Sequence, residues 1–123
     1  MVRKEIGLLI ETAEELGFQV CLFTEDEDVR VEFSKRSSCG RDFSFEIIVE
    51  EDDNMIDIWR SLQSYCDDFD VSAEAYLWLD ETGHGKNGAP FEMIDVYKDM
   101  EECKKFVCEL ADKVFDDEHR RNN

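Results

Sequence analysis

Basic residues are scarce in this chain, and that scarcity limits the ligands that it can bind. Its 123 residues include 14 lysines and arginines against 32 aspartates and glutamates, a formal net charge of −18 at pH 7. A surface with this charge repels nucleic acid, anionic membranes and phosphate-bearing ligands, and it attracts cationic partners. The composition therefore predicts no direct nucleic-acid binding and no membrane association.

Long hydrophobic runs are absent as well. No apolar run approaches the roughly 18 to 20 residues that a membrane span needs. Glu5 also places an acid where a signal peptide would begin its apolar stretch. These two observations predict a cytoplasmic protein.

Closely spaced cysteine pairs are missing too. The five cysteines are an odd number, form no CxxC motif and stand mostly among apolar neighbours: Cys21, Cys39, Cys66, Cys103 and Cys108. In cytoplasmic proteins such cysteines are usually reduced and fill core space. The sequence therefore predicts free thiols rather than disulfides. A zinc site made from Cys39, Cys66 and His84 would need a spacing that no known zinc finger uses.

No catalytic signature is present. The glycine-rich segment 83–88 lacks the GxxxxGK[ST] spacing of a phosphate-binding loop, and the DxDxDG loop of an EF-hand is missing. His84 lies near Asp80 and Glu81 in the sequence, but only the fold could bring a cysteine to it as a nucleophile. With 32 acids, a close pair of carboxylates is expected by chance. We expect no enzymatic activity, no catalytic residues, no cofactor and no metal.

The chain does contain enough hydrophobic side chain to fold. Hydrophobic residues make up 42% of it, including nine phenylalanines, which excludes the disordered class that so many charges would otherwise indicate. A chain of this length can bury a core without disulfide or metal staples. We expect one acidic globular domain over residues 1–118 and a polar C-terminal tail over residues 119–123.

The spacing of the apolar residues predicts an α+β fold. Helical periodicity covers residues 6–16 and ends at Gly17. Alternating apolar positions then indicate three strands, at 18–23, 29–33 and 43–49. An acidic turn at 25–28 and a basic loop at 34–41 join them. Three consecutive strands with short connections form an antiparallel β-meander.

A helix is expected directly after the third strand. Asp53 or Asn54 is placed to cap it, and its apolar stripe runs over residues 55–69. This order of helix, three strands and helix matches double-stranded RNA-binding domains, which meet phosphates with lysines at the start of their second helix. Residues 50–53 are all acidic here, so the charge argues against duplex RNA as a ligand.

Two further helices complete the prediction. Residues 71–80 fit either a strand or one face of a helix, and we favour a short helix capped by Asp70. A loop follows at 82–89, and the last helix has Pro90 in its first turn and runs to Asp117. The expected order is α-β-β-β-α-α-α, with the three-stranded sheet packed against helices.

The acids are concentrated in the middle of the chain. Residues 42–81 hold thirteen carboxylates and one basic residue, Arg60, so these forty residues carry a charge of −12. The acidic stretches fall at turns and helix boundaries, where all can be solvated, and solubility alone is one explanation. A second uses the charge of duplex DNA, about one negative charge per 1.7 Å of axis. A rigid array of carboxylates can imitate that charge in a protein groove that binds DNA.

Ten residues are candidate contacts for such a groove. Their carboxylates would pair with its arginines, and an aromatic anchor would hold when salt screens the charges. Trp78 and Tyr97 are further candidates for the anchor. The predicted partner-binding residues are Glu50, Glu51, Asp52, Asp53, Asp67, Asp68, Asp70, Tyr76, Asp80 and Glu81.

The second half of the chain resembles a known group of proteins. The segments 74–80 (EAYLWLD) and 83–90 (GHGKNGAP), followed by an acidic helix, are similar to small proteins carried by bacterial prophages and conjugative elements. Small acidic proteins of such elements resemble the DNA-mimic class of anti-CRISPR and antirestriction proteins. The resemblance implies a non-enzymatic inhibitor that occupies the basic DNA-binding groove of a CRISPR or restriction nuclease. Its most specific form blocks the site where an RNA-guided nuclease reads the PAM, the short DNA motif beside its target.

Two alternatives stay open. An acidic adaptor or immunity-type protein would bind a basic protein partner without competing with DNA. The glycines of the loop at 82–90 either allow a tight path between packed helices or present His84 and Lys86 to a partner.

Overall fold

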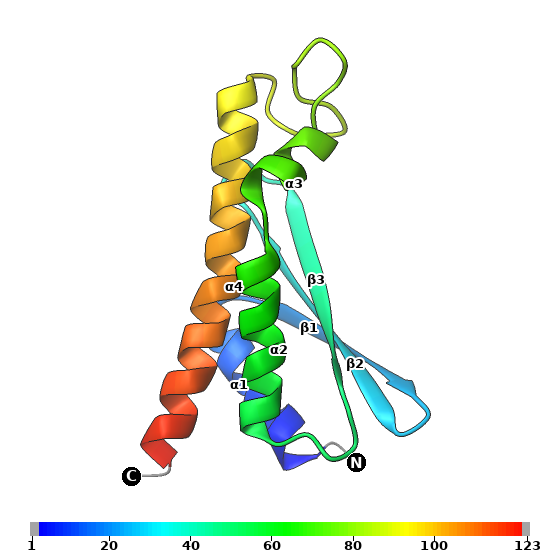
Figure 1. The fold of residues 1–123 in the computed structure, drawn as a ribbon, viewed down its shortest axis with the longest axis vertical. Helices are drawn as coiled ribbons and strands as arrows, with labels where there is room; N and C mark the ends of the chain where they lie inside the picture. The colour runs from blue at the N-terminus through cyan, green and yellow to red at the C-terminus, as the bar shows by residue number, and fades with distance from the viewer. Residues whose placement is uncertain (1–2, 122–123) are drawn as a thin grey trace.

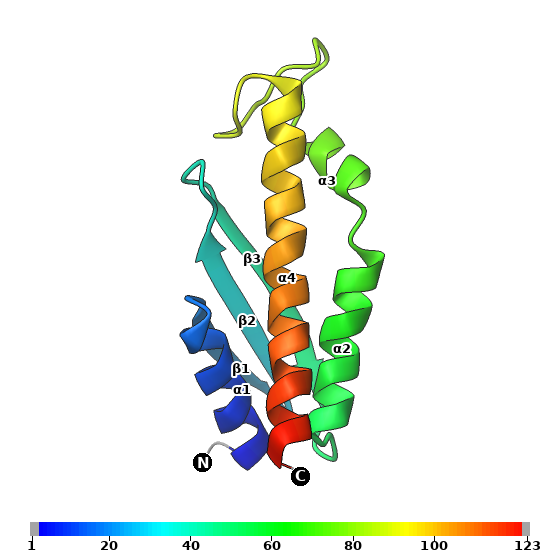
Figure 2. The ribbon, with the colours of Figure 1, turned by 90° about the vertical axis from the view of Figure 1, so that its left-hand side faces the viewer.

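The helices of this protein cover one face of a three-stranded sheet and leave the other face open to solvent (Figure 1, Figure 2). The computed structural model describes residues 3–121. The elements follow one another as α1 (Lys4–Glu15), β1 (Gln19–Glu25), β2 (Asp28–Arg36), β3 (Asp42–Val49), α2 (Met55–Asp68), α3 (Val71–Leu77) and α4 (Met93–Arg121). The predicted α+β class and the predicted element order are confirmed.

The sheet is an antiparallel meander in the order β1-β2-β3, as the sequence predicts. Asp26 has a φ of 57° in the turn between β1 and β2, a left-handed conformation that aspartate tolerates. Alternate residues of β3 are buried against the helices: Phe43, Phe45, Ile47 and Val49. Strand β2 continues to Arg36, so the loop before β3 is shorter than the predicted 34–41.

The core is built along α4, the longest helix. Its 29 residues rise about 43 Å, which gives the molecule its elongated shape (Figure 1). Helices α1, α2 and α3 all contact α4. Between α4 and the sheet, Phe18, Phe33 and Phe45 form an aromatic cluster with ring centroids 5.0 to 6.1 Å apart. The buried stripe of α4 consists of Val96, Met100, Cys103, Val107, Leu110, Ala111 and Val114.

Both ends of α4 differ from the prediction. The helix begins at Met93, so Pro90 lies in the loop before it and not in its first turn. It continues to Arg121, so residues 119–121 belong to the helix and not to a tail, while 122 and 123 lie outside the described residues. Asp117 pairs with side chains three and four residues away, and such pairs support a helix beyond the point where apolar periodicity ends.

Side chains cap the two middle helices as expected. The Asn54 side chain accepts a hydrogen bond from the Asp57 amide and Asp57 accepts one from the Asn54 amide, a capping box that starts α2. The Asp70 carboxylate accepts from the Ala73 amide at 3.1 Å and starts α3. The favoured helical assignment of the segment after Asp70 is therefore confirmed.

The prediction of free thiols is wrong for two of the five cysteines. Cys66 on α2 and Cys108 on α4 form a disulfide, with their Cα atoms 5.3 Å apart. Among the others only Cys103 is a buried thiol, while Cys21 and Cys39 are exposed. The two bonded residues are 42 positions apart, and no spacing rule indicates that α2 and α4 lie side by side.

This disulfide removes the cysteine argument for a cytoplasmic location, because stable disulfides are rare in that compartment. The structure also bears on whether the chain can cross a membrane. Over residues 3–121 no helix combines the length and apolarity that crossing a bilayer requires.

Replacing both Cys66 and Cys108 by serine should lower the free energy of unfolding by about 2–4 kcal/mol, because the disulfide restricts the unfolded chain. Urea denaturation followed by circular dichroism measures this change. A reducing agent should lower wild-type stability to a similar extent and leave the double variant unchanged. Cys21→Ser, at an exposed free thiol, is the matched control, and equal stability of the double variant and this control contradicts the expectation.

Candidate functional site

The predicted acidic residues lie in three groups that follow one another along the length of the molecule (Figure 1). We call them the lower turn (Glu50, Glu51, Asp52 and Asp53), the helix junction (Asp67, Asp68 and Asp70) and the tip pair (Asp80 and Glu81). The lower turn precedes α2, the helix junction separates α2 from α3, and the tip pair follows α3. Together the nine carboxylates form what we call the acidic side.

These nine carboxylates are not neutralised inside the protein. Within residues 3–121 none of them forms a salt bridge. Cations pair with other acids instead: Arg30 with Glu25 and Glu46, and Arg41 with Asp99. Eight of the nine residues are exposed, and Asp53 is half-buried. Their charge is therefore available to a partner.

The charge density of the acidic side can be compared with that of DNA. Helix α2 has 14 residues, a rise of about 21 Å, and duplex DNA carries about twelve negative charges over that length. Residues 50–70 hold eight carboxylates and Arg60, a net charge of −7. The charges of the turns at both ends are here set against the length of the helix alone, so residues 50–70 have at most roughly half the charge density of a duplex.

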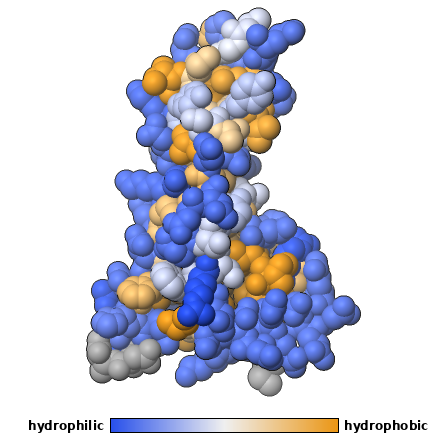
Figure 3. All heavy atoms as spheres, viewed as in Figure 1, coloured by the Kyte–Doolittle hydropathy of each residue, from blue (hydrophilic) through white to orange (hydrophobic). Residues whose placement is uncertain are grey.

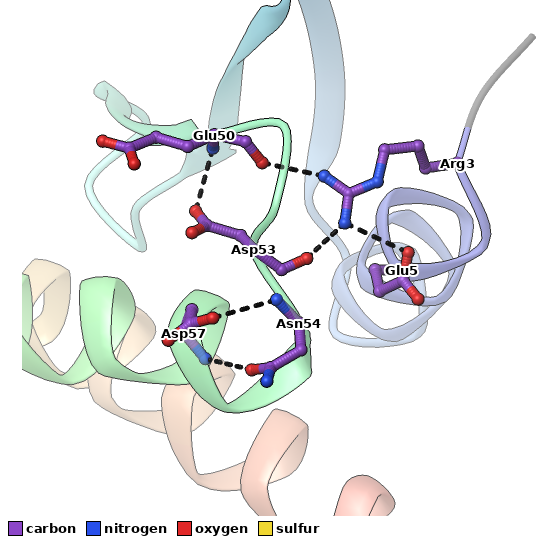
Figure 4. A network of polar contacts seen from close by, with 6 residues as sticks. All are labelled: Arg3, Glu5, Glu50, Asp53, Asn54 and Asp57. Atoms are coloured by element: carbon purple, nitrogen blue, oxygen red, sulfur yellow. Dashed lines mark hydrogen bonds and ion pairs between the residues drawn. The ribbon is translucent and has the colours of Figure 1, made fainter.

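Arg3 holds the lower turn together from one side (Figure 4). Its guanidinium donates hydrogen bonds to the backbone carbonyls of Glu50, at 2.8 Å, and of Asp53, and it pairs with Glu5 at 3.2 Å. The Asp53 carboxylate accepts from the Glu50 amide at 2.8 Å. Because Arg3 is bonded to carbonyl oxygens here, it shapes the turn without forming an ion pair with the turn's own carboxylates.

A second acidic turn adds to the lower turn, and sequence reasoning did not place it there. Glu27, in the β1–β2 turn, lies against Glu51 and is the main cause that raises the pKa of Glu51. Burial and the charges of Asp52 and Asp28 raise this pKa further, and Arg3 opposes them. The sequence shows both acidic turns, but only the folded sheet brings them together.

The tip pair divides into a structural acid and an exposed one. The Asp80 carboxylate accepts hydrogen bonds from the Thr82 hydroxyl and amide, at 2.6 and 2.8 Å, and from the His84 amide at 3.1 Å. The bond from the Thr82 side chain is the main cause that holds the pKa of Asp80 below its usual range. Asp80 therefore orders the loop, and Glu81 is the better placed of the two to meet a partner.

The loop at 82–90 follows a tight path, as expected if its glycines serve to connect packed helices. A Cβ at Gly85 would stand 1.7 Å from the Pro90 carbonyl oxygen, so only glycine fits there. The His84 ring stacks on Phe91 at 4.2 Å and lies 2.9 Å from the Thr82 hydroxyl. Its two contacts here are thus an aromatic ring and a hydroxyl.

Large apolar side chains are exposed at the same end of the molecule, which we call the tip: the end of α3, residues 78–92 and the start of α4. Figure 3 shows apolar side chains on the surface there. Beside them, a groove of about 300 Å³ is lined by Tyr76, Leu77, Leu79 and the tip pair together with Lys86. The exposed fractions are 76% for Tyr76, 64% for Leu77 and Phe91, 62% for Ile94 and 46% for Met93.

Of the three predicted aromatic anchors only Tyr76 is well exposed. Trp78 is half-buried with the Arg41 guanidinium 4.5 Å from its ring centroid, and Tyr97 packs half-buried on the core. Sequence reasoning missed the four other exposed residues of the tip. A signal for two of them existed, because Met93 and Ile94 fall outside the apolar stripe that begins at Val96.

A buried ion pair connects the tip to the rest of the fold. Arg41, in the loop before β3, pairs with Asp99 of α4 at 2.6 Å, and the two side chains are 9% and 3% exposed. The same guanidinium lies 3.1 Å from the Cys103 sulfur. Burial raises the pKa of Asp99, but hydrogen bonds from Ser37, Arg41 and Cys39 outweigh it and bring this pKa below its usual range.

Asp99→Ala should lower the free energy of unfolding by about 3–5 kcal/mol, because it leaves the Arg41 charge buried without a partner. The Arg41–Asp99 pair contributes its full stability above the pKa of Asp99 in the unfolded chain, about 3.9. This contribution is lost as the pH falls through the lower pKa that Asp99 has in the folded protein. Urea titrations at neutral and acidic pH measure both effects. Asp42→Asn, which breaks the exposed Arg36–Asp42 pair, should leave stability close to wild type, and an equal loss in both variants refutes the special role of Asp99.

Glu51→Gln should raise stability at neutral pH. The pKa of Glu51 is higher in the folded protein than in the unfolded chain. The protonated side chain therefore adds stability at a pH below its unfolded-state pKa, and this added stability is lost as the pH rises through its folded-state pKa. Thermal melts across this pH range should show variant and wild type diverging as the pH rises. Glu101→Gln removes one exposed charge from α4 and is the control; the expectation fails if it stabilises as much as Glu51→Gln.

The residue roles above come from geometry and charge. Comparison with protein-family models, with curated protein sequences and with solved structures gave no match. The acidic side and the exposed tip are therefore the two features on which a functional proposal for this chain rests.

Proposed function

We propose that this protein is a non-enzymatic inhibitor that imitates the charge of DNA and blocks a DNA-binding defence nuclease. In the most specific version it is an anti-CRISPR protein at the site where an RNA-guided nuclease binds the PAM. The observation that carries the proposal is the acidic side, nine carboxylates at the lower turn, the helix junction and the tip that form no salt bridge with any group in residues 3–121.

Arginines that read the PAM donate paired hydrogen bonds to base edges. A carboxylate offers such an arginine two acceptor oxygens in the same fork geometry and a full negative charge. The exposed acids of the lower turn and the helix junction are the proposed acceptors. Asp80 contributes by fixing the loop that carries Glu81.

Charge alone would give weak binding at cellular salt. Ligands that make six to ten phosphate contacts lose about 10³ to 10⁵ in affinity between about 50 and 200 mM salt, and residues 50–70 have at most about half the charge density of DNA. Contacts that resist screening are needed as well. The apolar residues of the tip supply them in this proposal, because apolar burial does not depend on the attraction of charges.

The proposal places the protein in the cytoplasm, where such nucleases act. The Cys66–Cys108 disulfide is atypical of that compartment. In the proposal it is a structural staple between α2 and α4, and neither cysteine belongs to the acidic side.

The second candidate is an acidic adaptor or immunity-type protein that binds a basic protein without competing with DNA. The exposed tip favours it, because contiguous apolar patches with polar rims are typical of protein–protein interfaces. Excess duplex DNA distinguishes the two functions. A mimic is displaced from its target by the duplex, whereas an adaptor bound at a separate surface stays in place.

The test uses purified guide-loaded RNA-guided nucleases and restriction endonucleases, each assayed for DNA cleavage with increasing amounts of the whole chain. We expect inhibition of at least one enzyme, relieved by excess target duplex. A variant with lysine at Glu51, Asp52, Asp67 and Asp68 should inhibit at least about 100-fold less, because it opposes cations to cations at four contacts.

The matched control carries the same charge change on other surfaces, with lysine at the exposed residues Glu11, Glu14, Glu101 and Asp112. It should inhibit nearly as well as wild type, since long-range steering changes but the contacts do not. Inhibition that is lost equally in both variants contradicts a site on the acidic side. Inhibition of none of the enzymes contradicts the proposed function itself.

A further inference from the structure

Strand β1 has one paired edge and one unpaired edge. Its residues pair with β2, and within the described part of the chain no backbone hydrogen bond joins β1 to any other segment. Six of its seven residues are exposed, and only Val20 is half-buried. The β1–β2 hairpin projects past the helices in Figure 1. Its outer edge therefore presents backbone donors and acceptors that another strand can pair with.

This edge is also neutral, in contrast to the rest of the molecule. No charged residue occurs between Gln19 and Thr24, although 37% of the chain is charged. Leu22 and Phe23 are 36% and 40% exposed. Natural edge strands are commonly protected by charges, proline or a bulge. The opposite edge strand, β3, has Asp42 and Glu46 at exposed positions, whereas β1 has a charge only at its last residue.

We propose that β1 pairs antiparallel with β1 of a second copy of this chain, which gives a symmetric dimer with a continuous six-stranded sheet. The charge of the molecule selects this occupant. Each copy carries −18, so two copies can approach closely only where both are neutral, and β1 brings a neutral strand from each side. A two-fold axis makes the same strand complementary to itself.

The register follows from the same reasoning. With the axis at Leu22, this residue faces its own copy, Phe23 faces Cys21, and Glu25 faces Gln19. No carboxylate then stands opposite another, which would destabilise the pair. The apolar side chains of β1 then contact their cross-strand neighbours on the two faces of the sheet.

In this dimer the helix junction and the tip pair lie away from the interface in both copies, and the lower turn, which meets the β1–β2 turn at Glu51, is the part of the acidic side nearest to it. Strand β1 is at one edge of the sheet, and β3, at the other edge, is the strand that contacts α2. The inference does not rest on the proposed nuclease target. It also has the opposite salt dependence, because added salt screens repulsion between two anionic copies but weakens attraction between the acidic side and a cationic groove.

Sedimentation velocity of the whole chain tests the dimer, over protein concentrations from about 5 to about 500 μM, the range in which a micromolar Kd is visible. We expect the mass to rise from monomer to dimer and the apparent Kd to tighten severalfold from low to high salt. Hydrogen–deuterium exchange should slow at residues 19–25 as the dimer forms. A monomer throughout this range at both salt concentrations overturns the proposal.

Leu22→Asp should weaken the dimer about tenfold or more, because it replaces an apolar pair at the axis by two carboxylates that face each other across the interface. Ile48→Asp is the matched control, since it places the same charge at an exposed apolar residue of the other edge strand, 43% exposed, and should leave the dimer intact. Circular dichroism reports whether each variant is folded.

Cys21→Lys covers the case in which Leu22→Asp does not fold. Cys21 is paired with Glu32 across the hairpin, so a lysine there gains an opposite charge in its own copy while it charges the neutral edge. It should weaken the dimer without loss of stability. A dimer that neither β1 variant weakens, or that Ile48→Asp disrupts instead, overturns the proposed interface whether or not a nuclease is inhibited.

Discussion

The Arg41–Asp99 pair is the interaction on which the upper half of this molecule depends. It is buried, and its partners come from the loop before β3 and from the long helix α4, segments that are far apart in the chain. The guanidinium also covers Trp78, where the chain leaves α3 for the tip loop. A buried charge needs its partner and its hydrogen bonds to be tolerated at all. One ion pair thereby fixes the positions of the sheet, α4 and the tip relative to one another.

Basic residues are scarce in this chain, so those that make structural contacts, as Arg41 does, are not available to the acidic side. Arg30 pairs with acids on the open face of the sheet, Arg3 shapes the lower turn through its carbonyls, and Lys113 joins α4 to α1. Few basic groups remain for the acidic side, so its charge is not compensated. The raised pKa of Glu51 shows the cost of this crowding: its contact with Glu27 is the main cause, followed by burial and by the charges of Asp52 and Asp28. A cationic partner would lower the electrostatic free energy of this acidic surface.

The three exposed features of the molecule differ in how they attract partners. The acidic side acts at long range and is weakened by salt. The apolar tip and the neutral edge of β1 act only at contact, through burial and backbone pairing. The tip follows α3 and β1 forms the sheet edge opposite β3, so the tip and β1 are different parts of the molecule.

Local patterns in the sequence were sufficient for the element order. Alternation in β3, the capping residues Asn54 and Asp70 and the periodicity of α4 each reflect interactions within a few residues, and these can be read from the chain directly. The concentration of acid in residues 42–81 was equally visible. The Cys66–Cys108 bond, the meeting of Glu27 with Glu51, the burial of Trp78 and the exposure of Phe91 and Ile94 were decided by tertiary structure alone. Each depends on which face of one element packs against another distant in sequence, and residue spacing within a single element carries no information about that packing.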